Sequence, residues 1–231
     1  SMVAEESSQV LTCAKSNYIP SATLAGLNET LKEQGGTIGV VGLPCQILAL
    51  RKMQTSRHEL GSKTVTLAIG LFCTWALSFR EFNEFLRGKV GTALVKRFDI
   101  PPPPANILVV DTDAGPLELS LEELRAFIKP TCNICYDMTS EFADISVGMV
   151  EGMEDWNTLI VRTPEGKKLV EKAKVSGIIE TKPLDEARLS HLRDASLRKK
   201  KKAIGEIVKR TGDESNLLYL RLGDEEKRKS F

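Results

Sequence analysis

The stretch from Thr37 to Lys52, TIGVVGLPCQILALRK, changes its pattern at Pro44. Residues 37–43 form a short apolar run of the kind that makes a buried parallel strand. Residues 46–53 then predict a helix, and Cys45 lies at the junction. Backbone N–H groups are free at a helix start and favour a thiolate there. Cys45 therefore differs from cysteines that fill a core inside an element. Its role depends on where the other cysteines lie.

The same alternation continues along the chain. Residues 21–34 predict a helix, residues 65–72 a second buried strand that ends at Cys73, and residues 78–90 another helix. This β-α-β-α rhythm favours a parallel, layered α/β core. Further strands are expected at residues 97–100, 106–111, 144–147 and 158–162, and further helices at residues 121–128 and 164–175. We predict an α/β fold, with a layered, mostly parallel sheet core and an inserted small region of strands and loops that bears cysteines.

Residues from Leu184 onward are rich in charge, and residues 198–202, RKKKK, form a basic run on a predicted helix. A solvated helix face is favoured for this run over contact with a partner or nucleic acid. We expect residues 1–183 to form one α/β domain and residues 184–231 a charged helical segment, frayed over residues 223–231.

Composition places the chain among ordinary globular proteins. Of its 231 residues, 42% are hydrophobic and 27% charged, and the net charge is +1. This charge favours neither nucleic acid nor an acidic partner, so no nucleic-acid binding is expected. No apolar run approaches the roughly 18 residues that span a membrane, and the acidic N-terminus does not read as a signal peptide. A cytoplasmic protein without a membrane span is expected.

Cysteines carry the strongest chemical signal. Cys132 and Cys135 form a C-x-x-C motif, whose spacing lets one tight turn aim two thiolates at one metal centre. Cys45 and Cys73 each follow a predicted strand, and the carboxyl ends of neighbouring parallel strands share the edge where cofactors usually bind. Together they supply four thiolates, the number that holds a 4Fe–4S cluster. Cys13 lies outside this set and is expected to be a buried or pocket residue.

Three alternatives to the cluster remain open. A structural zinc site usually pairs two C-x-x-C motifs, and the chain has one. A thioredoxin-like dithiol would begin a helix after a strand, whereas a predicted helix and Pro130 precede Cys132 here. Buried thiols without a cofactor are the third alternative. A disulfide framework is not expected, because the cysteines number five and the compartment is expected to be reducing.

Longer motifs connect the chain to a family. Residues 41–52 (VGLPCQILALRK), 69–73 (IGLFC), 132–148 (CNICYDMTSEFADISVG) and 156–173 (WNTLIVRTPEGKKLVEKA) resemble the beta subunit of coenzyme F-420 hydrogenases and dehydrogenases. The resemblance runs from about residue 6 to about residue 202. It implies a 4Fe–4S cluster and FAD, with coenzyme F-420 as substrate. It also implies redox partner subunits within a larger complex.

The resemblance further assigns residues. The cluster ligands would be Cys45, Cys73, Cys132 and Cys135. The cofactor-binding set would be Ser16, Asn17, Tyr18, Gly42, Pro44, Gln46, Asp137, Ser140, Asp144, Ser146, Gly148, Trp156 and Arg162. Asp144 and Ser146 alternate with apolar residues on a short predicted strand, so they can share a face toward a cofactor. The alternatives are a turn or strand-end cap for Asp144, a surface ion pair for Arg162 and core packing for Trp156.

Three departures from the family pattern concern the flavin. The family usually has a further N-terminal segment, with a Gly-Gly motif, ahead of the region to which residue 6 onward corresponds, and that segment is expected to be missing here. Lys15-Ser16-Asn17-Tyr18 stands where the family has Gly-Ser/Thr-Lys-Tyr. Residues 149–155, MVEGMED, keep one glycine of a glycine-rich loop and add three acids, which repel a dinucleotide phosphate. We therefore expect a flavin site that is incomplete or completed by another chain.

The predicted function follows from the cofactors. A flavin accepts a hydride as two electrons, and a cluster passes electrons singly. We predict an iron–sulfur flavoprotein oxidoreductase subunit that passes electrons between reduced coenzyme F-420, FAD, a 4Fe–4S cluster and a partner. The alternative is a non-catalytic iron–sulfur relay or docking subunit that has lost flavin binding, and the third possibility is a zinc-stabilised interaction domain. The sequence assigns no catalytic residue.

Overall fold

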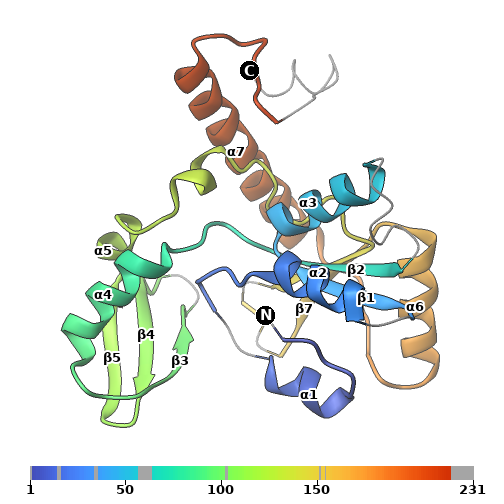
Figure 1. The fold of residues 1–231 in the computed structure, drawn as a ribbon, viewed down its shortest axis with the longest axis horizontal. Helices are drawn as coiled ribbons and strands as arrows, with labels where there is room; N and C mark the ends of the chain where they lie inside the picture. Colours follow the sequence, from blue (N-terminus) through green and yellow to red (C-terminus); the bar gives the residue numbers. More distant parts are fainter. Residues whose placement is uncertain are drawn as a thin grey trace. The chain divides into compact units, whose positions relative to one another are not determined.

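The computed structural model describes residues 2–14, 17–33, 36–56, 64–101, 104–150, 152, 153 and 155–219. The chain forms two compact units, each built from two separate stretches of sequence (Figure 1). The first unit comprises residues 1–22 and 75–132, and the second comprises residues 23–74 and 133–231. The domain boundary expected after residue 183 does not coincide with this division, because the C-terminal helix belongs to the second unit.

A mixed four-stranded sheet organises the second unit. Its order is β1 (Ile38–Gly42), β2 (Val65–Leu71), β6 (Ile145–Met149) and β7 (Asn157–Val161). The first three strands run parallel, and β7 is antiparallel to β6. The prediction of a mostly parallel α/β core is confirmed, with each predicted strand within two residues of its observed bounds.

Helices of the second unit are α2 (Thr23–Glu33), α3 (Pro44–Thr55), α6 (Pro164–Val175) and α7 (Glu186–Thr211). Leu27 of α2 and the fully buried Ile47 and Leu50 of α3 pack with Val40 and Ala68 of β1 and β2. Pro44 begins α3, where its fixed φ suits a helix and its missing N–H is not needed. The strand-to-helix change in the sequence therefore occurs at the predicted place.

Residues 75–132 contribute most of the first unit. Its helices are α1 (Ser7–Thr12), α4 (Phe79–Val90) and α5 (Leu121–Arg125), and its antiparallel sheet has the order β3 (Val95–Asp99), β4 (Ile107–Thr112) and β5 (Gly115–Ser120). A separate core, which includes Phe82, Leu108 and Leu119, joins α4 to this sheet. This sheet confirms the predicted insertion of a small β region.

Two elements of the first unit, β5 and α1, were not predicted from the sequence. β5 contains Pro116, which argues against a central strand, but β5 pairs on one side with β4 and a proline is tolerated there. α1 is six residues long and buries none of them, so no apolar periodicity marks it. Helix α5 is also shorter than the predicted residues 121–128. Across the described residues, no helix is both long and apolar enough to cross a membrane.

Gly70 of β2 lies against the loop that connects Cys135 to β6. A Cβ added at Gly70 would overlap both Oγ and Cβ of Ser140 and lie 2.9 Å from Cβ of Ala143. Ser140 itself is fully buried and adopts a left-handed backbone conformation, with φ of 56°. The loop therefore packs directly on the strand backbone, which leaves no room for a side chain.

We predict that Gly70→Ala destabilises the protein by about 1 to 3 kcal/mol, because the loop must shift to accept a methyl group. Urea denaturation of the purified chain measures this difference. Gly88→Ala is the matched control, since Gly88 lies exposed inside α4 with no atom within 4 Å of its added Cβ. The control should be neutral or more stable by up to about 1 kcal/mol; equal destabilisation of both variants would contradict the packing argument.

Candidate functional site

Cys45 and Cys73 leave the same edge of the parallel sheet. Parallel pairing places Gly42 of β1 beside Gly70 of β2, and each cysteine follows its glycine by three residues. Cys45 occupies the second position of α3 and is exposed, whereas Cys73 is partly buried. The predicted arrangement at the strand ends is therefore observed.

The C-x-x-C motif lies at the end of a short 3₁₀ helix, η1 (Pro130–Ile134). Cys132 is the last residue of the first unit, and its Sγ lies 3.8 Å from the carbonyl oxygen of Ala76. Cys135 belongs to the second unit, and its Sγ lies 3.6 Å from the carbonyl oxygen of Asp137. Three of the four predicted ligands, Cys45, Cys73 and Cys135, thus belong to the second unit. Only two residues separate Cys132 from Cys135 in the sequence.

Hydrogen bonds hold the backbone beside these cysteines. The N–H of Cys73 donates to the carbonyl of Met138 at 2.9 Å, which ties the end of β2 to the loop after Cys135. Nζ of Lys199, on α7, donates to the carbonyl of Cys73 at 2.6 Å. The hydroxyl of Tyr219 donates to the carbonyl of Ile134 at 2.7 Å. Residues far apart in sequence therefore fix the segments that carry Cys73 and Cys135.

Tyr219 lies between two of the cysteine-bearing segments. Its ring packs against Tyr136, with 6.2 Å between the ring centroids, and Nζ of Lys52 lies 5.7 Å from its centroid. Burial raises the pKa of Tyr219 most, and the negative charges of Cys135, Asp137 and Cys45 raise it further. The phenol therefore stays protonated and acts as the donor to the carbonyl of Ile134.

Buried polar atoms without partners lie in the loop after Cys135. Asp137 is 3% exposed, and its Oδ2 accepts from the N–H of Glu141 at 2.8 Å. Its Oδ1 and the Oγ of Ser140 are buried with no hydrogen bond of normal geometry. Burial is the main cause that raises the pKa of Asp137, and the charge of Glu141 adds to it. Most buried polar atoms in proteins have a hydrogen-bond partner, so strain in this loop, an ordered water or a bound group has to account for these two atoms.

The cysteines suit an iron–sulfur cluster by donor type. In the part of the chain that the structure describes, no three Cys, His, Asp or Glu side chains converge as the ligands of one metal ion. A 4Fe–4S cluster needs no such convergence, because its four thiolates bond different irons. The exposed helix start at Cys45 and the partly buried loops at Cys73 and Cys135 are compatible with thiolate ligands of this kind.

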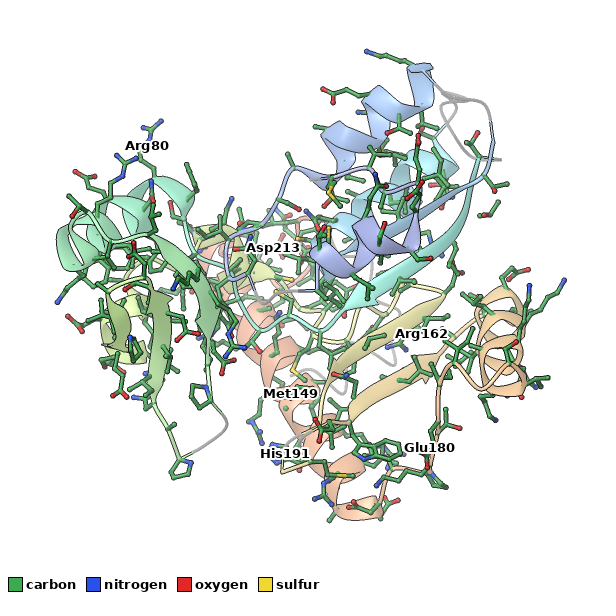
Figure 2. The ribbon with its side chains drawn as sticks, turned by 90° about the horizontal axis from the view of Figure 1, so that it is seen from below. Arg80, Met149, Arg162, Glu180, His191 and Asp213 are labelled. Carbon is green, nitrogen blue, oxygen red and sulfur yellow. The ribbon has the colours of Figure 1, made fainter. Side chains whose placement is uncertain are left out.

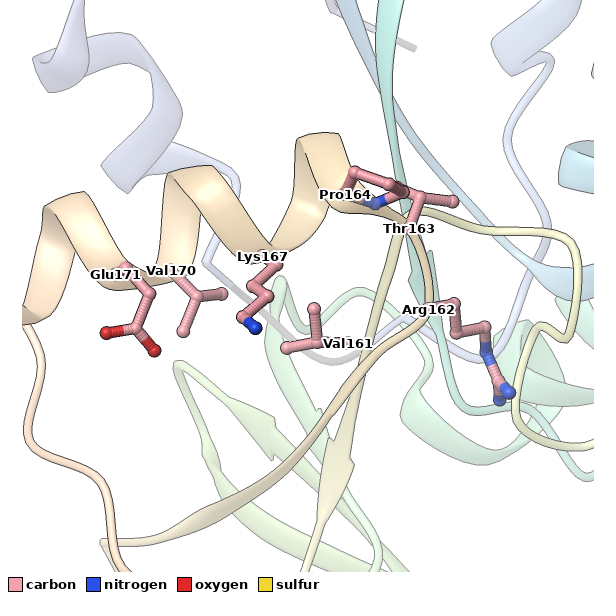
Figure 3. A pocket seen from close by; sticks show the side chains of 7 residues that line it. All are labelled: Val161, Arg162, Thr163, Pro164, Lys167, Val170 and Glu171. Atoms are coloured by element: carbon pink, nitrogen blue, oxygen red, sulfur yellow. The ribbon is translucent and has the colours of Figure 1, made fainter.

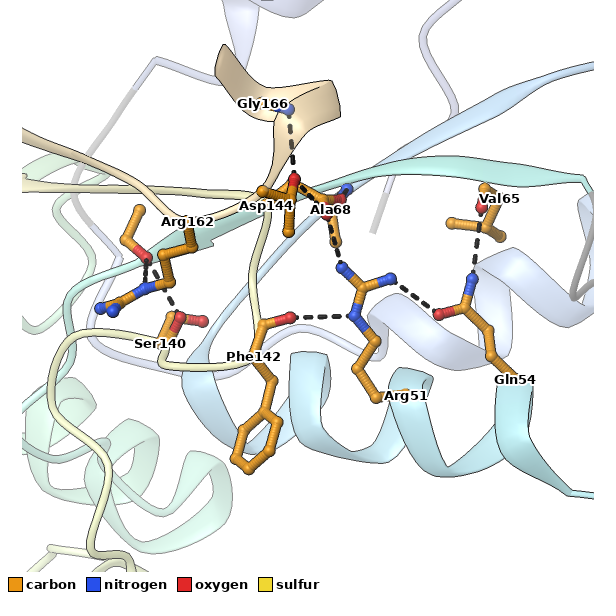
Figure 4. A network of polar contacts seen from close by, with 11 residues as sticks. Arg51, Gln54, Val65, Ala68, Ser140, Phe142, Asp144, Arg162 and Gly166 are labelled. Atoms are coloured by element: carbon orange, nitrogen blue, oxygen red, sulfur yellow. Dashed lines mark hydrogen bonds and ion pairs between the residues drawn. The ribbon is translucent and has the colours of Figure 1, made fainter.

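Asp144 anchors the strand edge rather than standing open to solvent (Figure 4). It is 6% exposed, and its Oδ2 accepts from the N–H of Ala68 at 2.7 Å. Its Oδ1 accepts from Oγ1 of Thr163 at 2.9 Å and lies 3.0 Å from Nη2 of Arg51. Both carboxylate oxygens are thus engaged within the protein, in the way expected of the strand-end cap that was the alternative for this residue.

Arg162, which directly follows β7, and Ser146 of β6 bind the same loop. Oγ of the fully buried Ser146 donates to the carbonyl of Ser140 at 3.1 Å and accepts from Nε of Arg162 at 3.2 Å. Nη2 of Arg162 donates to Oγ1 of Thr139 at 2.9 Å. Among the described residues no carboxylate pairs with Arg162, so the surface ion pair considered for it is not observed.

An open depression of about 630 Å³ lies beside α6, lined by Val161 to Pro164, Lys167, Val170 and Glu171. The guanidinium of Arg162 turns away from Lys167 and Glu171 there (Figure 3). Figure 2 shows Arg162 at one end of the β6–β7 pair and Met149 at the other. Arg162 thus contributes to the wall of this depression, while its guanidinium donates to Thr139 in the loop after Cys135.

Other predicted cofactor residues have structural contacts of their own. A Cβ on Gly148 would overlap the ring of Phe72, so this glycine permits the ring to pack on β6. Oε1 of Gln46 accepts from the N–H of Leu43 at 2.8 Å and so caps α3, and Gly42 lies against this cap, with Oε1 3.3 Å from an added Cβ. Trp156 is half-buried outside the three core clusters, with Nζ of Lys182 3.9 Å from its ring centroid.

The predicted residues near the N-terminus belong to the first unit. Oδ1 of Asn17 accepts from the N–H of Ile19, and the hydroxyl of Tyr18 accepts from the N–H of Ile100. The structure does not describe Lys15, Ser16, Glu151, Glu154 or residues 223–231. The expectation for Cys13 was wrong, because it is exposed at the end of α1, a helix that buries no residue.

Lys199, Tyr219 and Arg51 also belong to this region and were not predicted from the sequence. A signal existed for Lys199, because Lys199 and Lys200 precede the buried Ala203, Ile204 and Ile207 at helical spacing. Both lysines are half-buried, while the other three cations of the basic run are exposed, so the run is only partly a solvated face. Tyr219 follows the helix, where no periodicity could have marked it.

A family model that describes the C terminus of the beta subunit of coenzyme F420 hydrogenase/dehydrogenase matches residues 35–187. The chain belongs to this family. It is 31% identical over 218 residues to the coenzyme F420 hydrogenase subunit beta of Methanothermobacter thermautotrophicus, a match that covers 90% of this chain and 76% of the relative. It is 33% identical over 183 residues to the coenzyme F420-dependent sulfite reductase of Methanocaldococcus jannaschii, covering 73% and 28% respectively.

Solved structures lead to the same family. A chain of the F420-reducing NiFe hydrogenase complex from Methanosarcina barkeri superposes with a TM-score of 0.81 at 28% identity, covering 91% of this chain and 74% of that one. The predicted family is confirmed, and the chain is homologous to electron-transfer subunits of oxidoreductases linked to coenzyme F420.

We predict that Asp144→Asn lowers the free energy of unfolding by about 2 to 4 kcal/mol, because it leaves Arg51 without its buried anion. Chemical denaturation measures the loss. Asp111→Asn is the control, since Asp111 and Arg97 form an exposed pair, and its effect should stay below about 1 kcal/mol. Similar losses in the two variants would show that Asp144 is not a special anchor.

Proposed function

We propose that this chain is an electron-transfer subunit of a coenzyme F-420-linked oxidoreductase and that it holds a 4Fe–4S cluster. Cys45, Cys73, Cys132 and Cys135 would be the ligands. One observation carries the proposal: Cys45 and Cys73 leave the same sheet edge, and the N–H of Cys73 binds the loop that directly follows Cys135. Three thiols from distant parts of the sequence are thereby placed on neighbouring segments of one unit.

Each ligand has a distinct environment. Cys45 sits in the first turn of α3, where the positive end of the helix dipole favours a thiolate. Cys73 and Cys135 are partly buried; Lys199 donates to the carbonyl of Cys73, and Tyr219 donates to the carbonyl of Ile134, the residue before Cys135. A cluster bound here would supply one-electron transfer, and these residues would hold its sulfurs and limit the access of water.

We propose FAD as the partner cofactor and coenzyme F-420 as the hydride donor or acceptor. Family membership supports this half of the proposal, because two relatives are named for coenzyme F420. Of the predicted cofactor-binding residues in the second unit, Gln46, Trp156 and Arg162 have side chains that remain partly accessible. A flavin beside the cluster would convert a hydride into two single electrons.

The cluster-only relay is the second candidate, and particular contacts favour it. Asp144, Ser146 and Gly148 are accounted for by internal bonds or packing, and Gln46 caps a helix. None of these four residues needs a flavin to explain it. The replaced lysine at Asn17 and the glycine-poor loop at residues 149–155 point in the same direction.

We also propose a redox partner protein. The structural relative is a chain of a hydrogenase complex, and a one-electron carrier requires an acceptor. The exposed cations of the basic run, Arg198, Lys201 and Lys202, are available on the surface of α7 for such a contact.

Cysteine substitution tests the cluster. In protein purified without oxygen, we expect about four irons per chain and a broad absorbance shoulder near ~400 nm. Cys45→Ser and Cys73→Ser should each lower the iron content at least about twofold, because a thiolate ligand is lost. Cys13→Ser is the control, since Cys13 is exposed and outside the set. Unchanged iron in Cys45→Ser would refute its assignment as a ligand, and a colourless protein that contains zinc would refute the cluster.

Flavin titration separates the two candidates. If the chain binds FAD, added FAD should show a shifted and quenched spectrum that saturates with protein concentration. Arg162→Gln should weaken this binding, whereas Arg97→Gln, which alters an exposed cation of the first unit, should not. Free FAD fluorescence in the presence of excess cluster-loaded protein would instead support the relay.

A further inference from the structure

Lys199 of α7 is a half-buried cation that reaches the segment carrying Cys73. Its Nζ donates to the carbonyl of Cys73 at 2.6 Å. No carboxylate forms an ion pair with it among the residues that the structure describes. Its neighbour Lys200 differs, because Nζ of Lys200 lies 2.7 Å from Oε1 of Glu141. Lys200 is therefore paired with a carboxylate, whereas Lys199 donates to the backbone carbonyl of a predicted cluster ligand.

A half-buried ammonium group is costly without an anion nearby. The carboxylate of Asp137 feels the charge of Lys199, but no ion pair joins the two side chains in the described part of the chain. The protein's own carboxylates therefore do not explain why this cation is kept at the cysteine loops.

The position of Lys199 is rigid. Ala203, Ile204 and Ile207, one and two turns further along α7, are at most 1% exposed and pack against Tyr136. This packing fixes the helix on the segment that follows Cys135, and the hydrogen bond to Cys73 fixes the side chain. The ammonium group is consequently held near the segments of two predicted ligands from a third element.

We propose that Lys199 is a positioning residue that holds a positive charge beside the cluster and raises its reduction potential. This inference rests on the proposed cluster at Cys45, Cys73, Cys132 and Cys135. On reduction the cluster gains one electron and one negative charge, and no bond to the protein forms or breaks. A fixed neighbouring cation stabilises the more negative, reduced form more than the oxidised form.

Other cations near the cysteines are less suited to this role. Lys200 is paired with Glu141, and its Nζ lies 5.4 Å from the ring centroid of Tyr136. Lys52 lies over the ring of Tyr219. Lys201, the next residue after the pair, is exposed, so water and salt screen its charge. Lys201 therefore supplies a matched control on the same helix.

Redox titration of the full chain, purified without oxygen and reduced stepwise with dithionite, tests the inference. The reduced cluster is counted by electron paramagnetic resonance, and variants are compared at equal iron per chain. At the wild-type midpoint, Lys199→Gln should lower the ratio of reduced to oxidised cluster roughly three- to tenfold, and tenfold is about 59 mV for one electron. Lys199→Met should do the same, whereas Lys199→Arg should stay close to wild type.

Lys201→Gln should leave the ratio unchanged within error. Equal ratios in Lys199→Gln and Lys201→Gln would overturn the role of Lys199 while leaving the cluster in place. A fall in Lys199→Arg as large as in Lys199→Gln would assign the effect to packing rather than charge, and would also overturn it. A wild-type chain without iron would refute the cluster proposal itself, and the role of Lys199 with it.

Discussion

The second unit depends on the hydrogen bonds and the ion pair that the buried carboxylate of Asp144 makes. Its side chain accepts from the N–H of Ala68 on β2 and from Thr163 at the start of α6, and it pairs with Arg51 of α3. Its backbone N–H donates to Ala68, and its carbonyl accepts from Arg162. One buried residue, directly before β6, thus contacts β2, helix α3, the residue that follows β7 and the N-cap of α6. Because the group is charged and enclosed, removing any partner leaves an uncompensated polar atom.

This anchor also determines where the cysteine loop can lie. Residues 136–143 run from Cys135 to Asp144, so the loop is fixed at one end by the anchor and at the other by the C-x-x-C motif. Between these ends, Ser140 packs on the bare backbone of Gly70, and Met138 accepts from Cys73. The loop that would flank a cluster is therefore held by backbone contacts, which any shift of β2 would disturb.

Much of the fold could be predicted from local pattern. The change from an apolar run to a helix at Pro44 appeared where residues 37–53 placed it, and α6 has the bounds that Pro164 and Val175 indicated. Elements with weak local signals were missed, such as α1, which buries nothing, and β5, which begins with Gly115-Pro116. The roles of Asp144 and Gly148 could not be predicted, because alternation along a strand shows which residues share a face but not what covers that face.

The sequence by itself determined the residue types and their order: four cysteines at strand ends and in one C-x-x-C motif, and a rhythm that leads to parallel strands. These follow from local chemistry, since strand and helix periodicity and thiol spacing act over a few residues. Only the tertiary structure decided which side chains meet. Arg51 reaches Asp144 across 93 positions and Lys199 reaches Cys73 across 126. Such pairs depend on how strands and helices pack, which no short stretch of sequence encodes.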